Sequence, residues 1–371
     1  MSMRILHVTE VMQGGVADFL ASITSRQLEE SAKVYVIYPK LKQPIQARIF
    51  LDQSKKNTSS HIIQTNSSLF RMVQRFLLMI VLLIRLRWFL MKSHFDIIHL
   101  HSSFAGLARF PGLISKKKTS IVFSPHGLSF LQSNHLSIMS HAFLTVEKYL
   151  ARRENLFICT SASEAQLVSN KLVPKNKVML IANGIENEII RKNPRSFPKG
   201  RFRIAMIGRI TYQKAPWVFN EIAAVCSHLA DFIWIGAEHG VPIKWLDRRN
   251  IEILPWLNRE ELIKQLESID LIVHPTLWEG FPLSVALAQG RGIPALVSNV
   301  IGNRDVISHE YSGFVCDSFS DYETRVKQII GSESLYNFLS RGSLKHAREF
   351  LSDINIGRTT LHLYQQYLSL K

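Results

Sequence analysis

The stretch FRIAMIGRITYQKAP (202–216) begins as a short apolar run and ends in a loop that carries a glycine and two cations. An unbroken apolar run of this length is typical of a strand buried on both faces of a parallel sheet. Similar runs follow it at intervals filled by helical patterns: DFIWIG (231–236), NIEILP (250–255), DLIVHP (270–275) and IPALVS (293–298). The alternation of strands and helices predicts a doubly wound α/β domain.

A second series of strands precedes this one: RILHVT (4–9), KVYVIYP (33–39), DIIHLHS (96–102), SIVFSPH (120–126) and LFICTS (156–161). The polar, proline-bearing stretch 191–200 separates the two series and predicts a linker. We therefore expect Rossmann-like domains over 1–190 and 201–350, with a helix over 351–371 that packs back toward the first. Such sheets bind ligands at the carboxyl ends of their strands, so a cleft between facing domains is expected.

The composition of this 371-residue chain indicates its cellular location and the kind of partner it meets. Three cysteines without a C-x-x-C pair argue against a disulfide framework or a structural zinc site. The N-terminus runs directly into a strand pattern, so we expect no secretion signal and a cytoplasmic location. The net charge of +16 is uneven: residues 1–190 hold 23 Lys+Arg against 11 Asp+Glu, and the remainder 22 against 18. The N-terminal half is expected to meet an anionic partner.

A membrane surface fits that charge better than nucleic acid, because the chain shows no recognised nucleic-acid module and no interleaved stacking aromatics. Residues 69–92 look helical, but their uncharged run of nine residues is too short to span a bilayer. Apolar Leu78, Leu82 and Phe89 share the helix face of the basic residues Arg71, Arg75, Arg85 and Lys92. With Lys116–Lys118, this face predicts peripheral docking on anionic lipid. A buried helix without such a role is the alternative.

Arg209 and Lys214 lie where an open α/β sheet binds phosphate. Two fixed cations stabilise a diphosphate leaving group more as its bond to a sugar breaks, and they can replace a metal ion there. The chain has no D-x-D motif and no His/Cys/Asp cluster with metal-ligand spacing, so no metal and no cofactor is expected. Gly14 and Gly15 precede a helix, where they let the backbone approach a ligand closely and direct the first helix amides toward it.

Seven segments, in this order, resemble glycosyltransferase family 4: GGVADF (14–19), HLHSSFAGLAR (99–109), SPHGLSF (124–130), TSASEAQLV (160–168), NGIE (183–186), IGRITYQKAP (207–216) and WEGFPLSVALAQG (278–290). The resemblance covers residues 4 to about 350. It implies the GT-B architecture, with two facing Rossmann-like domains. It also implies retaining transfer from a nucleotide diphosphate sugar, with the leaving phosphate assisting deprotonation of the acceptor.

The resemblance also implies roles for individual residues. Glu279, His126, Arg209 and Lys214 would form the catalytic group, and His101 and Asn183 would lie on the acceptor side. Further donor-binding positions are Gly14, Gly15, Gly208, Trp256, Leu257, Gly280, Phe281, Pro282 and Leu283. Trp256 and Leu257 would hold the nucleobase through their backbone. His99 is expected to be packed in the core.

One position departs from the family pattern, because Leu287 stands where a second glutamate usually holds the ribose. Leucine cannot accept a hydrogen bond from a hydroxyl, so another group must supply that contact or the donor is placed differently. The sequence thus predicts a glycosyltransferase that extends a lipid-linked saccharide in O-antigen, capsule or exopolysaccharide assembly. The alternatives are a nucleotide-sugar epimerase or hydrolase of the same fold and a catalytically degenerate membrane-binding homologue.

Overall fold

A computed structural model describes the chain over residues 2–9, 15–38, 68–114, 119–131, 137–152, 155–237, 245–247, 249–353 and 356–369. Gly14 and Lys116–Lys118, named above, lie outside the described residues, as do the side chains of residues 68–78. The described chain forms two compact units. The first comprises 1–130, 137–181 and 355–371, and the second essentially 182–354.

The first unit is built on a six-stranded parallel sheet in the order β2-β1-β3-β4-β5-β6. Its strands are β1 (Arg4–Thr9), β2 (Lys33–Ile37), β3 (Ile97–His101), β4 (Ser120–Ser124), β5 (Asn155–Cys159) and β6 (Val178–Leu180). Its helices of more than one turn are α1 (Gly15–Glu29), α3 (Ser68–Lys92), α5 (Ser137–Ala151), α6 (Ala162–Lys171) and α13 (Ile356–Ser369). Every residue of β3 and β4 is buried, as expected of strands covered on both faces.

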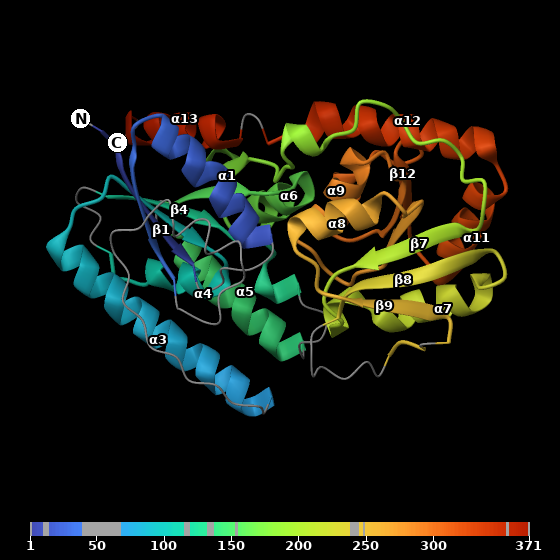
Figure 1. The fold of residues 1–371 in the computed structure, drawn as a ribbon. Helices are drawn as coiled ribbons and strands as arrows, with labels where there is room; N and C mark the ends of the chain where they lie inside the picture. Colours follow the sequence, from blue (N-terminus) through green and yellow to red (C-terminus); the bar gives the residue numbers. More distant parts are fainter. Residues whose placement is uncertain are drawn as a thin grey trace. The chain divides into compact units, whose positions relative to one another are not determined.

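The second unit holds a six-stranded parallel sheet in the order β12-β11-β10-β7-β8-β9. Strands β7, β8 and β9 lie side by side in this sheet (Figure 1). Its strands are β7 (Phe202–Ile207), β8 (Ala230–Ala237), β9 (Ile251–Pro255), β10 (Leu271–His274), β11 (Ala295–Ser298) and β12 (Gly313–Cys316). Its helices are α7 (Pro216–Cys226), α8 (Arg259–Leu266), α9 (Leu283–Gly290), α10 (Asn303–Val306), α11 (Phe319–Ile330) and α12 (Glu333–Phe350). Separate apolar clusters pack on its two faces.

The α/β fold class is confirmed, and each of the ten predicted runs coincides with a strand to within two residues at either end. Strands β6 and β12 were missed because each is a short edge strand of three or four residues. The C-terminal helix α13 belongs to the first unit and packs on α1. The domain boundary differs from the expected linker, because the second unit begins at residue 182.

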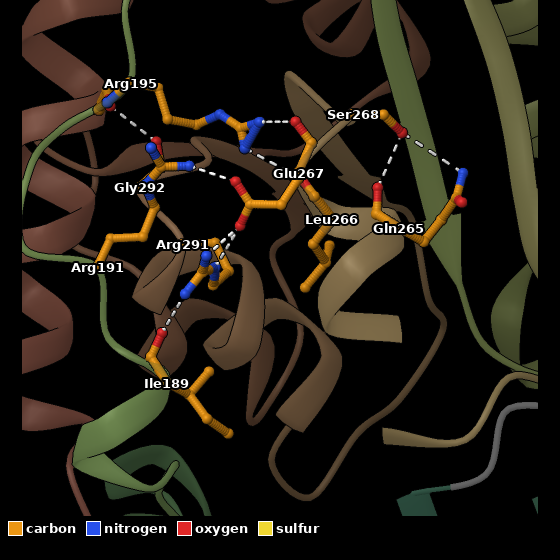
Figure 2. A network of polar contacts seen from close by, with 10 residues as sticks. Ile189, Arg191, Arg195, Gln265, Leu266, Glu267, Ser268, Arg291 and Gly292 are labelled. Carbon is orange, nitrogen blue, oxygen red and sulfur yellow. Dashed lines mark hydrogen bonds and ion pairs between the residues drawn. The ribbon is translucent and has the colours of Figure 1, made fainter. Parts of the chain in front are cut away.

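An arginine cluster explains why the stretch expected to be a linker belongs to the second unit. Figure 2 shows Arg191, Arg195 and Arg291 around Glu267, which follows α8. Arg191 Nη1 lies 2.5 Å and Arg291 Nε 2.9 Å from the carboxylate, while Arg195 Nη1 donates to the Leu266 carbonyl at 3.0 Å. Burial alone would raise the pKa of Glu267, but the Arg291 hydrogen bond and the positive charges of the three arginines lower it. These contacts fix residues 191–195 on the second sheet's unit.

The outer face of α3 differs from the predicted one. Leu82 is buried, and the Phe89 ring packs against Phe95 with centroids 5.5 Å apart, so both face the core. The apolar side chains exposed on this helix are Ile80, Val81, Ile84, Trp88 and Met91, with Arg85, Arg87 and Lys92 exposed between them. The helix is rotated relative to the prediction, with Met79, Leu82 and Leu86 on its buried side. None of the described helices is long and apolar enough to span a membrane.

Candidate functional site

The second sheet reverses its strand order between β7 and β10, which pair in parallel as neighbours. Open α/β sheets bind ligands at the carboxyl ends of the strands on either side of such a reversal. The loop after β7 carries Gly208, Arg209 and Lys214, and the loop after β10 carries Glu279. The topology therefore brings together residues that lie 65 positions apart.

Lys214 and Glu279 form a direct ion pair, with Lys214 Nζ 2.5 Å from Glu279 Oε1. His274, the last residue of β10, is fully buried and places Nε2 3.4 Å from the same oxygen. Burial alone would raise the pKa of Glu279, but the charge of Lys214 and the contact with His274 lower it to about 2. Burial, with the nearby charge of Lys214, lowers the pKa of His274. The group is thus a carboxylate and an ammonium beside a neutral imidazole.

Polar contacts hold the two loops together around this pair. Gln213 Nε2 donates to the Trp278 carbonyl at 2.8 Å, and the Leu277 amide donates to the Gln213 carbonyl at 2.9 Å. Buried Asn303 donates to the hydroxyls of Thr276 and Ser298 at 2.9 and 2.8 Å. Fixing the donors and acceptors in advance is what a charge-stabilising site requires.

The predicted segment 280–283 leads into the first turn of α9. Pro282 occupies the N-cap position, and no side chain caps the helix. The first amides of a helix are available to an anion when no side chain accepts their hydrogen bonds. Leu287, on the next turn, is 6% exposed and packs in the apolar cluster beneath the helix. The leucine that replaces the family's usual glutamate is therefore part of the apolar core.

The remaining predicted donor residues line the same sheet edge. Gly208 has φ +154°, a conformation that disfavours a side chain, and a Cβ there would lie 3.1 Å from Lys214 Cε. Arg209 is exposed. Trp256 follows β9 and is 55% exposed, with its amide donating to the Ala237 carbonyl at 3.1 Å, whereas Leu257 is partly buried.

In the first unit, partly buried His126, which follows β4, joins a row with the buried His101 at the end of β3 and the buried His7 within β1. His126 Nε2 lies 3.1 Å from His101 Nδ1, and His101 Nε2 lies 3.0 Å from His7 Nδ1. The row ends on α1, where Gln27 Oε1 lies 2.9 Å from His7 Nε2. His126 itself has the left-handed φ of +53°, which non-glycine residues rarely adopt.

Three further predicted residues have simpler settings. His99 is buried between Ser124 Oγ at 2.8 Å and Tyr364 OH at 2.5 Å, which confirms that it is packed. Asn183 belongs to the second unit, is 3% exposed, and accepts a hydrogen bond from the Gly184 amide. Gly15 is the first residue of α1. The expected partnership of His101 with Asn183 on an acceptor side stays a prediction.

Among the described residues, one group of three side chains has ligand atoms close enough together to hold a metal ion: His7, His99 and His101, within 4.8 Å of one another. All six ring nitrogens of these histidines already lie within hydrogen-bond distance of a partner. Hydrogen bonds therefore account for the close approach of the three histidines. Nothing in the described part of the second unit places a comparable group at Glu279.

Sequence reasoning missed His274, His7 and Gln27. His274 could have been noticed as the last residue of a strand, five positions before Glu279. His7 pairs in register with His99 across two parallel strands, a match that requires knowing the strand order. Gln27 carried no signal, because a glutamine on a helix is ordinarily exposed.

Two family models match consecutive parts of the chain. Glycosyltransferase Family 4 matches residues 13–189, and Glycosyl transferases group 1 matches residues 187–343. A protein from the cps region of Klebsiella pneumoniae is 27% identical over 364 residues, covering 95% of each chain. The UDP-Gal:alpha-D-GlcNAc-diphosphoundecaprenol alpha-1,3-galactosyltransferase of Escherichia coli is 25% identical over 288 residues, covering 70% of this chain and 72% of that one.

Solved structures agree on the fold. Sucrose-phosphate synthase from Thermosynechococcus elongatus superposes with a TM-score of 0.78 at 15% identity, with each chain fully covered. Anabaena Alr3699/HepE in complex with UDP and glucose gives 0.77 at 16% identity, covering 98% of this chain and 100% of that one. With two Rossmann-like sheets and family matches that run from residue 13 to 343, the chain belongs to the glycosyltransferases, as a Family 4 domain followed by a group 1 domain.

Proposed function

We propose that the protein transfers a sugar, with retention and without a metal ion, from a nucleotide diphosphate sugar to a lipid-linked saccharide in bacterial surface-polysaccharide assembly. The observation that carries this proposal is the Lys214–Glu279 pair at the reversal point of the second sheet. Lys214 and Arg209 neutralise the diphosphate as it leaves, and Glu279 accepts hydrogen bonds from hydroxyls of the donor sugar. The Escherichia coli relative is named as a galactosyltransferase that acts on a diphosphoundecaprenol-linked sugar, which supports the class of acceptor.

A thermal-shift screen with UDP, GDP, ADP, dTDP and CMP tests the donor site, because a ligand that binds only the folded state raises Tm. One diphosphate should raise Tm in the wild type, and the rise should be lost in Lys214→Ala and Arg209→Ala. Lys327→Ala is the matched control, since Lys327 is an exposed lysine on α11 of the same unit. A rise that persists in both site variants would place the nucleotide elsewhere.

Product analysis then separates transfer from the alternative reactions. Incubation with the selected nucleotide sugar and a diphosphoundecaprenol-linked acceptor should give a product that keeps the donor's anomeric configuration by NMR. Activity should survive treatment with EDTA. Conversion of the donor without any acceptor would instead favour an epimerase or hydrolase, and inversion at the anomeric carbon would contradict the proposed mechanism.

We also propose that the exposed face of α3, defined by Ile80, Val81, Ile84, Trp88 and Met91, docks peripherally on the inner face of the cell membrane. Exposed Arg85, Arg87 and Lys92 flank these apolar side chains, and Lys92 Nζ lies 3.9 Å from the centre of the Trp88 ring. Apolar side chains can enter the headgroup layer while the cations contact lipid phosphates. The protein would then encounter a lipid-linked acceptor at the membrane surface in which that acceptor is anchored.

Flotation with vesicles containing phosphatidylglycerol tests this surface. The wild type should float with anionic vesicles and not with purely zwitterionic ones, and Ile84→Glu/Trp88→Glu should remain at the bottom. Phe350→Glu, an equally exposed apolar position on α12, serves as the control and should behave as wild type. Flotation of the double variant would contradict the assignment of this face.

A further inference from the structure

We propose that Gln27, His7 and His101 are positioning residues that hold His126 in a single neutral tautomer, with hydrogen on Nε2 and an open acceptor at Nδ1. The inference rests on the proposed function for its catalytic consequence, because the family resemblance implies that His126 belongs to the catalytic group. The chain of hydrogen bonds itself is a property of the first unit alone. We refer to these four residues as the histidine chain.

The direction of the chain begins at Gln27. Its side-chain oxygen lies 2.9 Å from His7 Nε2, and an amide oxygen can only accept a hydrogen bond. His7 Nε2 must therefore carry the hydrogen. In a neutral imidazole the other nitrogen is then an acceptor, so His7 Nδ1 accepts.

The same rule, one donor and one acceptor nitrogen in each neutral imidazole, applies to His101 and then to His126. His101 Nε2, 3.0 Å from His7 Nδ1, must donate, which leaves His101 Nδ1 as an acceptor. His126 Nε2, 3.1 Å from His101 Nδ1, must donate in turn. Nδ1 of His126 is then left with its lone pair. Turning the Gln27 amide around would reverse every hydrogen in the row, so Gln27 sets the direction.

The surroundings keep the histidines uncharged, as this argument requires. His7 and His101 are fully buried. Burial lowers the pKa of His7 to about 4 and that of His126 to about 3, and the pKa of His101 falls well below its usual range. No carboxylate contacts the row among the described residues to offset that burial. The Phe19 ring packs edge-on against His126, with centroids 5.0 Å apart, and covers the polar row with apolar surface.

The backbone at His126 is held in an unusual conformation that directs its ring toward His101. Its φ of +53° lies in the left-handed region, which is disfavoured for a non-glycine residue. The next amide, of Gly127, is tied to Glu164 Oε1 at 2.9 Å. Such strain persists only where the surrounding structure imposes it. In the described chain His126 Nδ1 has no hydrogen-bond partner.

The chemical consequence is a requirement on the ligand. A ring nitrogen fixed as an acceptor binds a hydroxyl hydrogen, and it cannot donate to an anionic oxygen. His126 would therefore select donor sugars that present a hydroxyl at this point. A fixed tautomer also removes the cost of choosing one when the sugar binds, which is a form of preorganisation.

The tautomers can be read directly in the ligand-free protein. Long-range ¹H–¹⁵N spectra of protein with ¹⁵N-labelled histidine distinguish the two neutral tautomers, and the His126→Gln variant identifies the signals of His126. His7, His101 and His126 should all carry hydrogen on Nε2 at pH 7.5. Hydrogen on Nδ1 of any of the three would overturn the proposal, as would a stoichiometric metal ion found by elemental analysis of the native protein.

Gln27→Leu then tests the source of the direction. Without the amide oxygen, His126 should become a mixture of tautomers, and turnover should fall about tenfold, less than the roughly hundredfold or larger loss of an acid–base group itself, because His126 is still present. Gln289→Leu is the matched control: Gln289 is a fully buried glutamine of the second unit, bonded to backbone carbonyls. It should leave the His126 spectrum unchanged. An unaltered His126 tautomer in Gln27→Leu would contradict the proposal.

The two proposals can fail separately. If no sugar transfer is found with any donor while the three histidines carry hydrogen on Nε2, the proposed function fails and the histidine chain stands. If transfer occurs and the tautomers differ, the histidine chain is wrong and the function is unaffected.

Discussion

Glu279 is a buried carboxylate that keeps its negative charge because two groups compensate its burial. Its side chain contacts Lys214, in the loop after β7, and His274, the last residue of β10. An unpaired buried charge would cost several kcal/mol, so the pair exists only as a unit. Glu279 therefore also holds the side chain of Lys214 in place.

The pH dependence of stability should reveal this pairing. Because the pKa of Glu279 is lowered from its ordinary 4.5 to about 2, its contribution to stability is complete above pH 4.5 and is lost as pH falls toward 2. The Tm of the wild type should exceed that of Glu279→Gln at pH 6, and the difference should shrink as pH is lowered to 3. A difference that stays constant over this range would mean that the ion pair does not contribute as described. Thermal unfolding followed by circular dichroism is the measurement.

Leu287 shows how a single residue can change a site without leaving a gap. The side chain packs with the apolar cluster under α9 and is 6% exposed. If the proposed donor binds here, contact with its ribose has to come from another part of the sheet edge. Exposed side chains at that edge include Trp256 after β9 and Arg209 and Tyr212 after β7.

At the scale of elements, the turn before α9 depends on a close approach of two backbone segments. Gly302 has φ +85°, and a Cβ there would lie 2.4 Å from the Gly280 carbonyl oxygen. Asn303, next in the chain, is the residue that ties the turn to Thr276. The loop after β11 therefore supports the segment 278–281 from behind.

Gly302→Ala should displace that turn. We expect a loss of stability of about 1–3 kcal/mol from backbone strain together with weaker nucleotide binding. Gly112→Ala is a matched control, because Gly112 has the same φ of +85° with nothing within 4 Å of the added Cβ. The control should lose stability and keep nucleotide binding. Chemical denaturation and nucleotide titration of both variants measure the two effects, and equal nucleotide affinities would contradict this role of Gly302.

At the scale of the whole molecule, the first unit is completed by the C-terminal end of the chain. Helix α13 packs on α1, and its Tyr364 is fully buried with its hydroxyl 2.5 Å from His99 Nδ1. Ile356, Leu361 and Tyr364 join the apolar core of that unit. Residues from both ends of the sequence therefore fold as one body.

Removal of residues 356–371 should consequently destabilise the first unit more than the second. Tyr364→Phe, which removes one buried hydroxyl, should cost about 1 kcal/mol, whereas the truncation should expose apolar surface of α1 and lose protection throughout the first sheet. Hydrogen exchange followed by mass spectrometry resolves the two units. Equal protection of β1 and β3 in the truncated and full-length proteins would show that α13 is dispensable.

The sequence by itself determined the two parallel sheets, because strands buried on both faces read as apolar runs between helices and need no knowledge of contacts. It also located Arg209, Lys214 and the 279–283 turn, since residues that follow strands of such a sheet share one edge. Edge strands β6 and β12 were too short to stand out. Only the tertiary structure decided which strands are neighbours, which face of α3 is buried, and where residues 182–200 belong.

The histidine chain illustrates the difference. His7, Gln27, His101 and His126 stand up to 119 positions apart, and the sequence singled out only His101 and His126, without linking them to each other or to the other two. Their alignment arises from the order β1-β3-β4 and from the placement of α1 above those strands. Whether a hydrogen bond forms depends on differences of a few tenths of an ångström in the donor–acceptor distance, and a linear sequence does not contain that information.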